Sequence, residues 1–275
     1  AVRALFLLAC GAAIALKSVM EANGTPGTLR VYGAAAEEQE GSKVYMAREG
    51  LFNDLDACLH WHPMEMASVI NMRFAAANMM KIHFYGKTAH AGAEPWKGRS
   101  ALHALELCQH GINLMREHIL PTARIHYIVE SGGVAPNIVA DYARLYLFVR
   151  DENRDHVVEM TEWIRQVAEG AALATQTRAE TNVYFGLHDL IPNTPLAERM
   201  QTHMQRVGAP QWTEEEQEFA KACQREMQVP EKGMATFVVP LQPEMTLGGS
   251  SDVADVSWLT PTMGLAMPSV PLEVS

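Results

Sequence analysis

Five patterned segments between residues 81 and 188 indicate the fold: KIHFY (81–85), SALHALELCQHGINLMRE (100–117), ARIHYIV (123–129), ARLYLFV (143–149) and NVYFGL (182–187). Apolar residues alternate in the short segments, which is typical of strands. In the long segment they recur every three or four positions, which is typical of a helix. A second helical pattern lies between Val157 and Ala171. The order βαββαβ predicts a split-βαβ, or ferredoxin-like, sandwich.

The chain before this stretch predicts part of an α/β domain. Residues 28–32 (TLRVY) are expected to form a strand, residues 41–49 a short helix, and residues 56–61 a second strand that Pro63 ends. Strand, crossover helix and strand together are typical of a parallel sheet. Ligands of such sheets lie beyond the carboxyl ends of the strands.

The chain after this stretch returns to helical patterns, at residues 196–207 and 214–227, and the tail beyond Trp258 is expected to lack clear structure. We therefore predict an α/β protein with a discontinuous domain, residues 1–72 and 189–275, and a βαββαβ domain, residues 73–188, inserted into it.

An apolar run near the start, Ala4–Leu16, has two interpretations. It continues into a pattern that ends at Asn23-Gly24, which predicts a buried helix with a glycine stop. A signal peptide is the alternative, and Leu8-Ala9-Cys10 resembles a lipoprotein cleavage box. The run is too short to span a bilayer, which takes about 20 residues.

The amino-acid composition limits the kinds of binding partner that we expect. The 275 residues include 32 acidic and 22 basic side chains, a net charge of −10. This charge disfavours nucleic acid and anionic membranes as partners, because both call for a concentrated basic face.

The four cysteines are far apart and form no CxxC pair, so we expect reduced thiols in a cytoplasmic protein. The sequence contains no G-x-S-x-G, P-loop or G-x-G-x-x-G motif.

Three residues of the discontinuous domain could carry chemistry. Glu37 and Glu38 are adjacent after the first expected strand, and His62 follows the second, two positions after His60. One carboxylate of such a pair can bind a metal while the other takes a proton from a metal-bound water. Acidic residues are also ordinary at a helix start. We expect Glu37, Glu38 and His62 to converge at one sheet edge.

The inserted domain contributes three more candidates. His90 lies in a loop, Asn137 lies in a turn that its Gly and Pro residues explain, and Arg150 closes a strand. An arginine there can bind a carboxylate through its planar guanidinium, or can simply be solvated. Asp252 and Asp255 lie in a Gly/Ser-rich loop and could support a site or begin a helix.

Six segments together resemble the aminoacylase-type zinc peptidase and amidohydrolase family: AAIALKSVME (12–21), AAAEE (34–38), GSKVYMAREGLFNDLDACLHWHP (41–63), FYGKTAHAGAEPWKGRSAL (84–102), SGGVAPNIVADYA (131–143) and SSDVADVSW (250–258). The resemblance implies a zinc-binding α/β domain with an inserted dimerisation or lid domain, and therefore a homodimer or a partner subunit. It also implies hydrolysis of an N-acyl amino acid at its amide bond.

The resemblance assigns a role to each candidate. Glu37 resembles the general base, while Glu38 and His62 resemble zinc ligands. His90 resembles the lid histidine that stabilises the oxyanion in a partner's site. Asn137 and Arg150 resemble lid residues that hold the substrate, with Arg150 at its carboxylate.

The motifs also depart from the family. Cys10 does not match the ligand stretch that precedes the first helix in the family, and no histidine follows His203. Catalytic zinc generally needs three protein ligands, and motif matching supplies Glu38 and His62. We therefore expect weak zinc binding and little activity. The alternatives are a non-catalytic dimerising partner or scaffold, and a lipid-anchored protein that uses Cys10.

Overall fold

The computed structural model describes residues 2–37 and 41–274. Its residues divide into two compact units. Unit 1 comprises residues 1–73, 191–245 and 255–275, and unit 2 comprises residues 74–190 and 246–254. The chain passes from one unit to the other at four places. Two of these lie in β3 (Met72–Phe74) and β8 (Met245–Leu247), which pair with each other.

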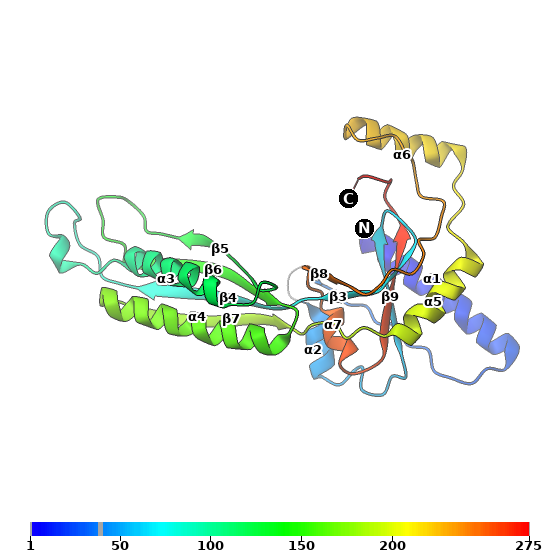
Figure 1. Cartoon of the computed structure of the whole chain (residues 1–275), viewed down its shortest axis with the longest axis horizontal. Helices are drawn as coiled ribbons and strands as arrows, with labels where there is room; N and C mark the ends of the chain where they lie inside the picture. The colour runs from blue at the N-terminus through cyan, green and yellow to red at the C-terminus, as the bar shows by residue number, and fades with distance from the viewer. Residues whose placement is uncertain (1, 38–40, 275) are drawn as a thin grey trace. The chain divides into compact units, whose positions relative to one another are not determined.

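Unit 2 is the predicted βαββαβ sandwich (Figure 1). Its elements are β4 (Ala76–Tyr85), α3 (Ala101–Met115), β5 (Arg124–Ser131), β6 (Tyr142–Asp151), α4 (Arg154–Thr175) and β7 (Arg178–Leu187), with 3-10 turns at Pro95–Lys97 and Arg116–His118. The strands form one antiparallel sheet in the order β5-β6-β4-β7. Side-chain caps fix the helix starts: Ser100 accepts from the His103 N–H of α3, and Asn153 from the Asp155 N–H of α4.

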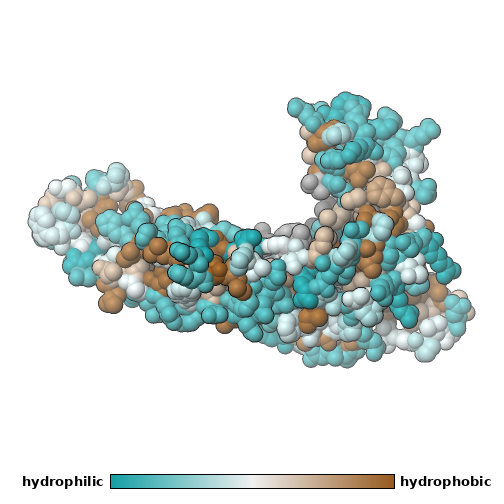
Figure 2. All heavy atoms as spheres, viewed as in Figure 1, coloured by the Kyte–Doolittle hydropathy of each residue, from teal (hydrophilic) through white to brown (hydrophobic). Residues whose placement is uncertain are grey.

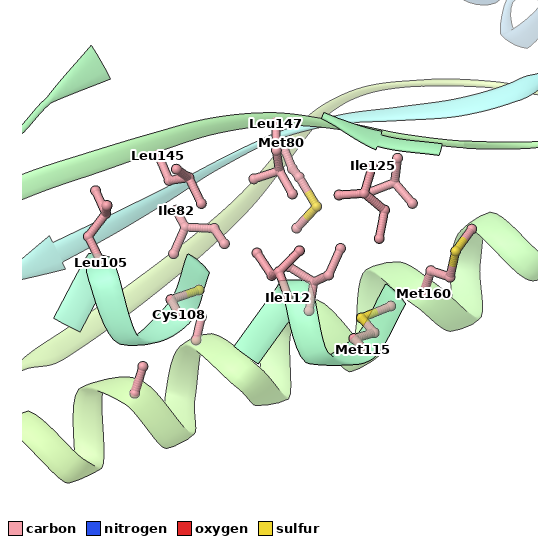
Figure 3. Close-up of a cluster of buried hydrophobic side chains, with 14 of the residues drawn as sticks. Met80, Ile82, Leu105, Cys108, Ile112, Met115, Ile125, Leu145, Leu147 and Met160 are labelled. Carbon is pink, nitrogen blue, oxygen red and sulfur yellow. The ribbon is translucent and has the colours of Figure 1, made fainter. Parts of the chain in front are cut away.

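The core of unit 2 lies between one face of the sheet and the two helices. Figure 3 shows Ile82, Leu145 and Leu147 of the strands pointing at Leu105 and Ile112 of α3. All five side chains are at most 1% exposed. Because alternate residues of a strand face opposite sides, the intervening residues of β4 and β6 form the other face of the sheet, which α3 and α4 do not cover.

Unit 1 is built around a three-stranded sheet in the order β1-β9-β2. Strand β9 (Thr262–Pro268) is central, parallel to β1 (Cys58–Met64) and antiparallel to β2 (Ser68–Ile70). The helix α5 (Thr194–Val207) packs on this sheet, where Ala197 contacts Val69 and Met263. Its other helices are α1 (Val2–Asn23), α2 (Ser42–Arg48) and α6 (Glu214–Glu226), and the short α7 (Val253–Ser257) begins at the boundary between the units.

Two expectations for unit 1 strands were wrong. Residues 28–32 form no strand. Side chains hold the segment instead, through a salt bridge from Arg30 to Asp54 (2.6 Å) and a hydrogen bond from the Tyr32 hydroxyl to the Leu51 carbonyl (2.7 Å). The tail beyond Trp258 is not irregular, because it contains β9.

Pro63 does not end the second strand either. It lies inside β1, opposite Met267 of β9. Within the described residues β1 pairs only with β9, and a proline is tolerated in such an edge strand because its missing N–H removes no ladder hydrogen bond on the open side.

The first helix forms as predicted and ends as predicted. Gly24 follows α1 with a φ of 60°, and the Thr25 N–H donates to the Met20 carbonyl (2.9 Å). The expectation that this helix is buried was wrong: Leu7 is 68% exposed and Ile14 67%. Among the described helices, none combines the length and apolar character needed to cross a bilayer.

Hydrophilic residues cover most of the surface around α6 (Figure 2). The first turn of this helix holds Glu214, Glu215 and Glu216, and Thr213 and Glu216 form a reciprocal capping box. The helix is fixed on its inner side by Gln224, whose amide donates to the Leu272 carbonyl (2.5 Å).

Candidate functional site

The predicted site residues divide between the two units. Glu37 and His62 lie in unit 1, and His90, Asn137 and Arg150 lie in unit 2. Glu38 lies outside the described residues. The expectation that Glu37 follows the end of a strand was wrong, because residues 28–32 do not form a strand. Glu37 is half-buried in a turn, after Ala36 with a φ of 55°, a left-handed conformation that is uncommon for alanine.

His62 lies within β1 rather than beyond its end, and its imidazole is exposed. Its Nδ1 is 2.9 Å from the Pro63 carbonyl oxygen. A carbonyl can only accept, so Nδ1 carries the proton and Nε2 presents a lone pair to solvent. A histidine whose Nδ1–H is held by a carbonyl in this way is a typical metal ligand through Nε2.

His60 occupies a different environment from His62. Burial, with Lys43 and His62 adding to it, lowers the pKa of His60 to about 4. The ring packs over Gly264 of β9, where a Cβ would lie 2.3 Å from its Cε1. His60 therefore fills a space in the sheet, while His62 is the accessible imidazole of the pair.

In residues 2–37 and 41–274, no three His, Cys, Asp or Glu side chains gather closely enough to hold a metal ion. Asp252 and Asp255 are 1% and 8% exposed and are engaged with other groups of the protein. The four cysteines are free thiols. Among the residues that the structure describes, His62 offers a ring nitrogen that could bind a metal, but no complete set of metal ligands surrounds it.

His90 and Asn137 are brought together by two loops of unit 2. The Ala91 N–H donates to the Asn137 carbonyl (2.9 Å), and the Val139 N–H donates to the Ala89 carbonyl (2.9 Å). Gly86 permits this close packing, because a Cβ there would lie 2.0 Å from the Arg99 carbonyl oxygen. Both His90 and Asn137 are exposed.

The imidazole of His90 is held in the opposite tautomer to that of His62. Its Nδ1 accepts from the Gly92 N–H (3.2 Å) and the Ala93 N–H (3.1 Å). An accepting Nδ1 has no proton, so a neutral His90 carries its proton on Nε2. The Nε2–H of this exposed residue is then a hydrogen-bond donor that solvent or a ligand can reach.

A cavity of about 770 Å³ opens beside these loops. The cavity is lined by sequence neighbours of His90 and Asn137, namely Ala91, Pro136 and Ile138. Arg99 and His103 also line it. Gly133 shapes its rim with a φ of 106°, which a residue with a side chain rarely adopts.

Arg150 lies at the other end of the same sheet. Its partner on β4 is Ala77, whereas the loops of His90 and Asn137 adjoin Tyr85. Eight residue-to-residue steps along β4 lead from Ala77 to Tyr85, which is roughly 26 Å at about 3.3 Å per step. His90 and Asn137 therefore form one group and Arg150 a second one.

The guanidinium of Arg150 is half-buried and only partly satisfied. It donates one hydrogen bond, from Nη1 to the Gly248 carbonyl (3.2 Å), and lies 5.4 Å from the centre of the Phe148 ring. Within the described residues its Nε is buried without a hydrogen-bond partner, and so is the hydroxyl of Ser250, two positions after Gly248. Burial lowers the pKa of Arg150, but an arginine stays charged at any physiological pH.

Comparisons with known proteins show which proteins this chain resembles. The peptidase dimerisation domain family matches residues 76–176. One subunit of the p-aminobenzoyl-glutamate hydrolase of Escherichia coli (strain K12) is 35% identical over 280 residues, which are 92% of this chain and 58% of that protein.

Solved structures share the fold. An aminobenzoyl-glutamate utilization protein from Klebsiella pneumoniae matches with a TM-score of 0.55 and 21% identity, over 82% of this chain and 53% of that one. A Bacillus subtilis protein described as a dinuclear metal binding peptidase from the M20 family matches with a TM-score of 0.50 and 16% identity, over 84% of this chain and 53% of that one. The chain thus spans about half the length of the relatives it matches.

Proposed function

We propose that this chain, which is similar to a peptidase dimerisation domain and to a subunit of p-aminobenzoyl-glutamate hydrolase, is a metal-dependent amidohydrolase that cleaves the amide bond of N-acyl amino acids, p-aminobenzoyl-glutamate-like compounds among them. In this proposal residues 1–72 and 189–275 are the catalytic-type domain, and residues 73–188 are the dimerisation and lid domain. The observation that carries it is the half-buried Arg150 guanidinium with an unpartnered Nε.

Arg150 is the residue that holds the carboxylate of the substrate. Even partial burial of a guanidinium without a counter-ion is costly, and a bound carboxylate reduces that cost through charge-assisted hydrogen bonds.

His62 and Glu38 are the zinc ligands of this proposal, and Glu37 is the general base. The exposed Nε2 lone pair of His62 supports its part. When bound, a zinc ion polarises the amide carbonyl and acidifies a water molecule. The described residues do not complete a ligand set, so we assign no reaction step to the metal.

His90 and Asn137 act on a substrate bound to a second copy of the chain. The roughly 26 Å of strand that separates their end of the sheet from Arg150 is too long for one small substrate to bridge. The Nε2–H of His90 is suited to donate to the oxyanion that forms when the amide carbonyl is attacked. Asn137 lies in the same exposed group and would hold the substrate from the partner's side.

With one or two ligands, this chain should bind zinc weakly and turn over slowly. Metal analysis after dialysis, combined with hydrolysis of an N-acyl-glutamate in added Zn²⁺, tests this expectation. We expect substoichiometric zinc and slow release of glutamate. Stoichiometric zinc, with turnover that Glu37→Ala abolishes, would contradict the weak-metal part of the proposal.

The second candidate function is a non-catalytic dimerising partner or scaffold, which the match of residues 76–176 to a dimerisation domain favours. Ligand binding separates the two functions. A chain that self-associates but binds no N-acyl amino acid is a scaffold, whereas binding that depends on Arg150 supports the hydrolase lineage.

A further inference from the structure

Two residues of β5 lie beside Arg150 on the uncovered face of the unit 2 sheet. In the register of β5 with β6, Arg124 is directly opposite Arg150, and His126 is directly opposite Phe148. Opposite residues on antiparallel strands are about 5 Å apart and share a face. The His126 and Phe148 ring centres are 5.8 Å apart.

The two arginines differ from the other cations of this face. Lys81 and Arg144 both pair with Glu130 (3.2 and 2.8 Å), and Arg178 pairs with Glu180. Within the described part of the chain, neither Arg124 nor Arg150 forms an ion pair with a carboxylate. One end of the face is neutralised, and the other carries two adjacent positive charges.

The positions of the two guanidiniums are fixed by neutral groups. Arg124 donates from Nη1 to the carbonyls of Pro121 (2.5 Å) and Ala123 (2.7 Å), and Arg150 donates to Gly248. Like charges directly opposite each other destabilise a sheet. An anion bound by both arginines would offset this penalty.

We propose that Arg124 and His126 bind a second carboxylate of the substrate and make the chain selective for N-acyl amino acids with an acidic side chain. This inference rests on the proposed function, in which Arg150 holds the first carboxylate. The spacing of adjacent strands suits the two carboxylates of one glutamate or aspartate. The Phe148 ring supplies the apolar surface between them, and His126 donates a hydrogen bond from its ring.

Equilibrium binding of N-benzoyl-L-glutamate and N-benzoyl-L-glutamine to the whole chain tests the inference, because the two probes differ only in the charge of the side-chain terminus. We expect the wild-type chain to bind the glutamate probe about tenfold more tightly or better, the worth of a charge-assisted hydrogen bond. Arg124→Gln should remove this preference by weakening the glutamate probe alone. Arg150→Gln should weaken both probes.

The controls use the same face of the sheet. Arg178→Gln removes an arginine from the neutralised end and should leave both affinities unchanged. Arg124→Lys keeps the charge and should keep part of the preference. Arg124 is exposed, so these variants should fold, which circular dichroism checks. His126→Gln should reduce the preference less than Arg124→Gln.

Different outcomes overturn the role of Arg124 and His126 and the proposed function. Equal binding of both probes by the wild-type chain, or an equal loss of both in Arg124→Gln, overturns the role of Arg124 and His126 and leaves the proposed function standing. Binding of neither probe overturns the proposed function, and the inference falls with it.

Discussion

At the scale of single residues, hydrogen bonds to the backbone decide which nitrogen each imidazole offers. The Pro63 carbonyl leaves His62 with a free Nε2 lone pair, while two N–H groups leave His90 with an Nε2–H. The sequence places both histidines in motifs, but it gives no sign of these tautomers, because the partners are backbone atoms positioned by local geometry.

Gly264 provides a direct test of the His60 packing. A methyl group there would lie 2.3 Å from the His60 ring, so Gly264→Ala should destabilise the chain by about 1–3 kcal/mol through overpacking. Gly170→Ala on α4 meets nothing within 4 Å and should stabilise by up to about 1 kcal/mol. Urea unfolding measures both. A Gly264→Ala variant as stable as wild type would contradict the contact.

Cys108 should be the least reactive thiol. It is fully buried, and burial raises its pKa to about 12 from an ordinary 9.0. Because a raised pKa favours the neutral thiol, its thiolate fraction at pH 8 is about a thousandfold below that of the unfolded chain. Maleimide labelling with peptide mapping should modify Cys10 and Cys223 first, and Cys108 only in denaturant. Fast labelling of Cys108 in the native chain would disagree with this core.

At the scale of secondary-structure elements, strands were predictable where the strands they pair with also show a clear alternation. Strands without such a patterned neighbour were not. The alternation in β4 and β6 and the stripe on α3 identify the sandwich, because each strand finds its neighbours within about 100 residues. Residues 28–32 alternate equally well but form no strand, since alternation does not supply a partner to pair with. Strand β9 was missed because a buried central strand has no polar alternation to reveal it.

The α3 helix offers a matched pair of substitutions. Ile112 is fully buried against the sheet, and Leu114, two residues away, is 61% exposed. Ile112→Ala should cost about 2–5 kcal/mol through the cavity it leaves. Leu114→Ala should change the stability by less than about 0.5 kcal/mol. Denaturant melts followed by circular dichroism compare the two, and equal effects would mean that α3 does not pack as described.

At the scale of the whole molecule, the resemblance to aminoacylase-type peptidases and amidohydrolases is confirmed by the comparisons. The motifs made this possible because six of them occur in one chain. The sequence did not predict how the candidate residues of unit 2 group in space. Asn137 and Arg150 are 13 positions apart in the chain, and the length of β6 separates them in space.

The exposed loop of Asn137 should take part in self-association. Val134, in this loop, is 88% exposed, and the proposal places the loop against a second copy. Val134→Asp should weaken self-association about tenfold or more, since an unpaired carboxylate is costly in an interface. Val207→Asp, at an 84% exposed position of α5, is the control. Sedimentation velocity measures both, and equal behaviour of the two variants would remove the loop from the interface.

The central claim is that Arg150 binds the carboxylate of an N-acyl amino acid, and titration calorimetry with N-benzoyl-L-alanine, which has a single carboxylate, tests it without requiring turnover. The account predicts that the wild-type chain binds this probe and that Arg150→Gln binds it about tenfold more weakly or less. Equal affinities of the two proteins, or no binding by the wild-type chain, would contradict it.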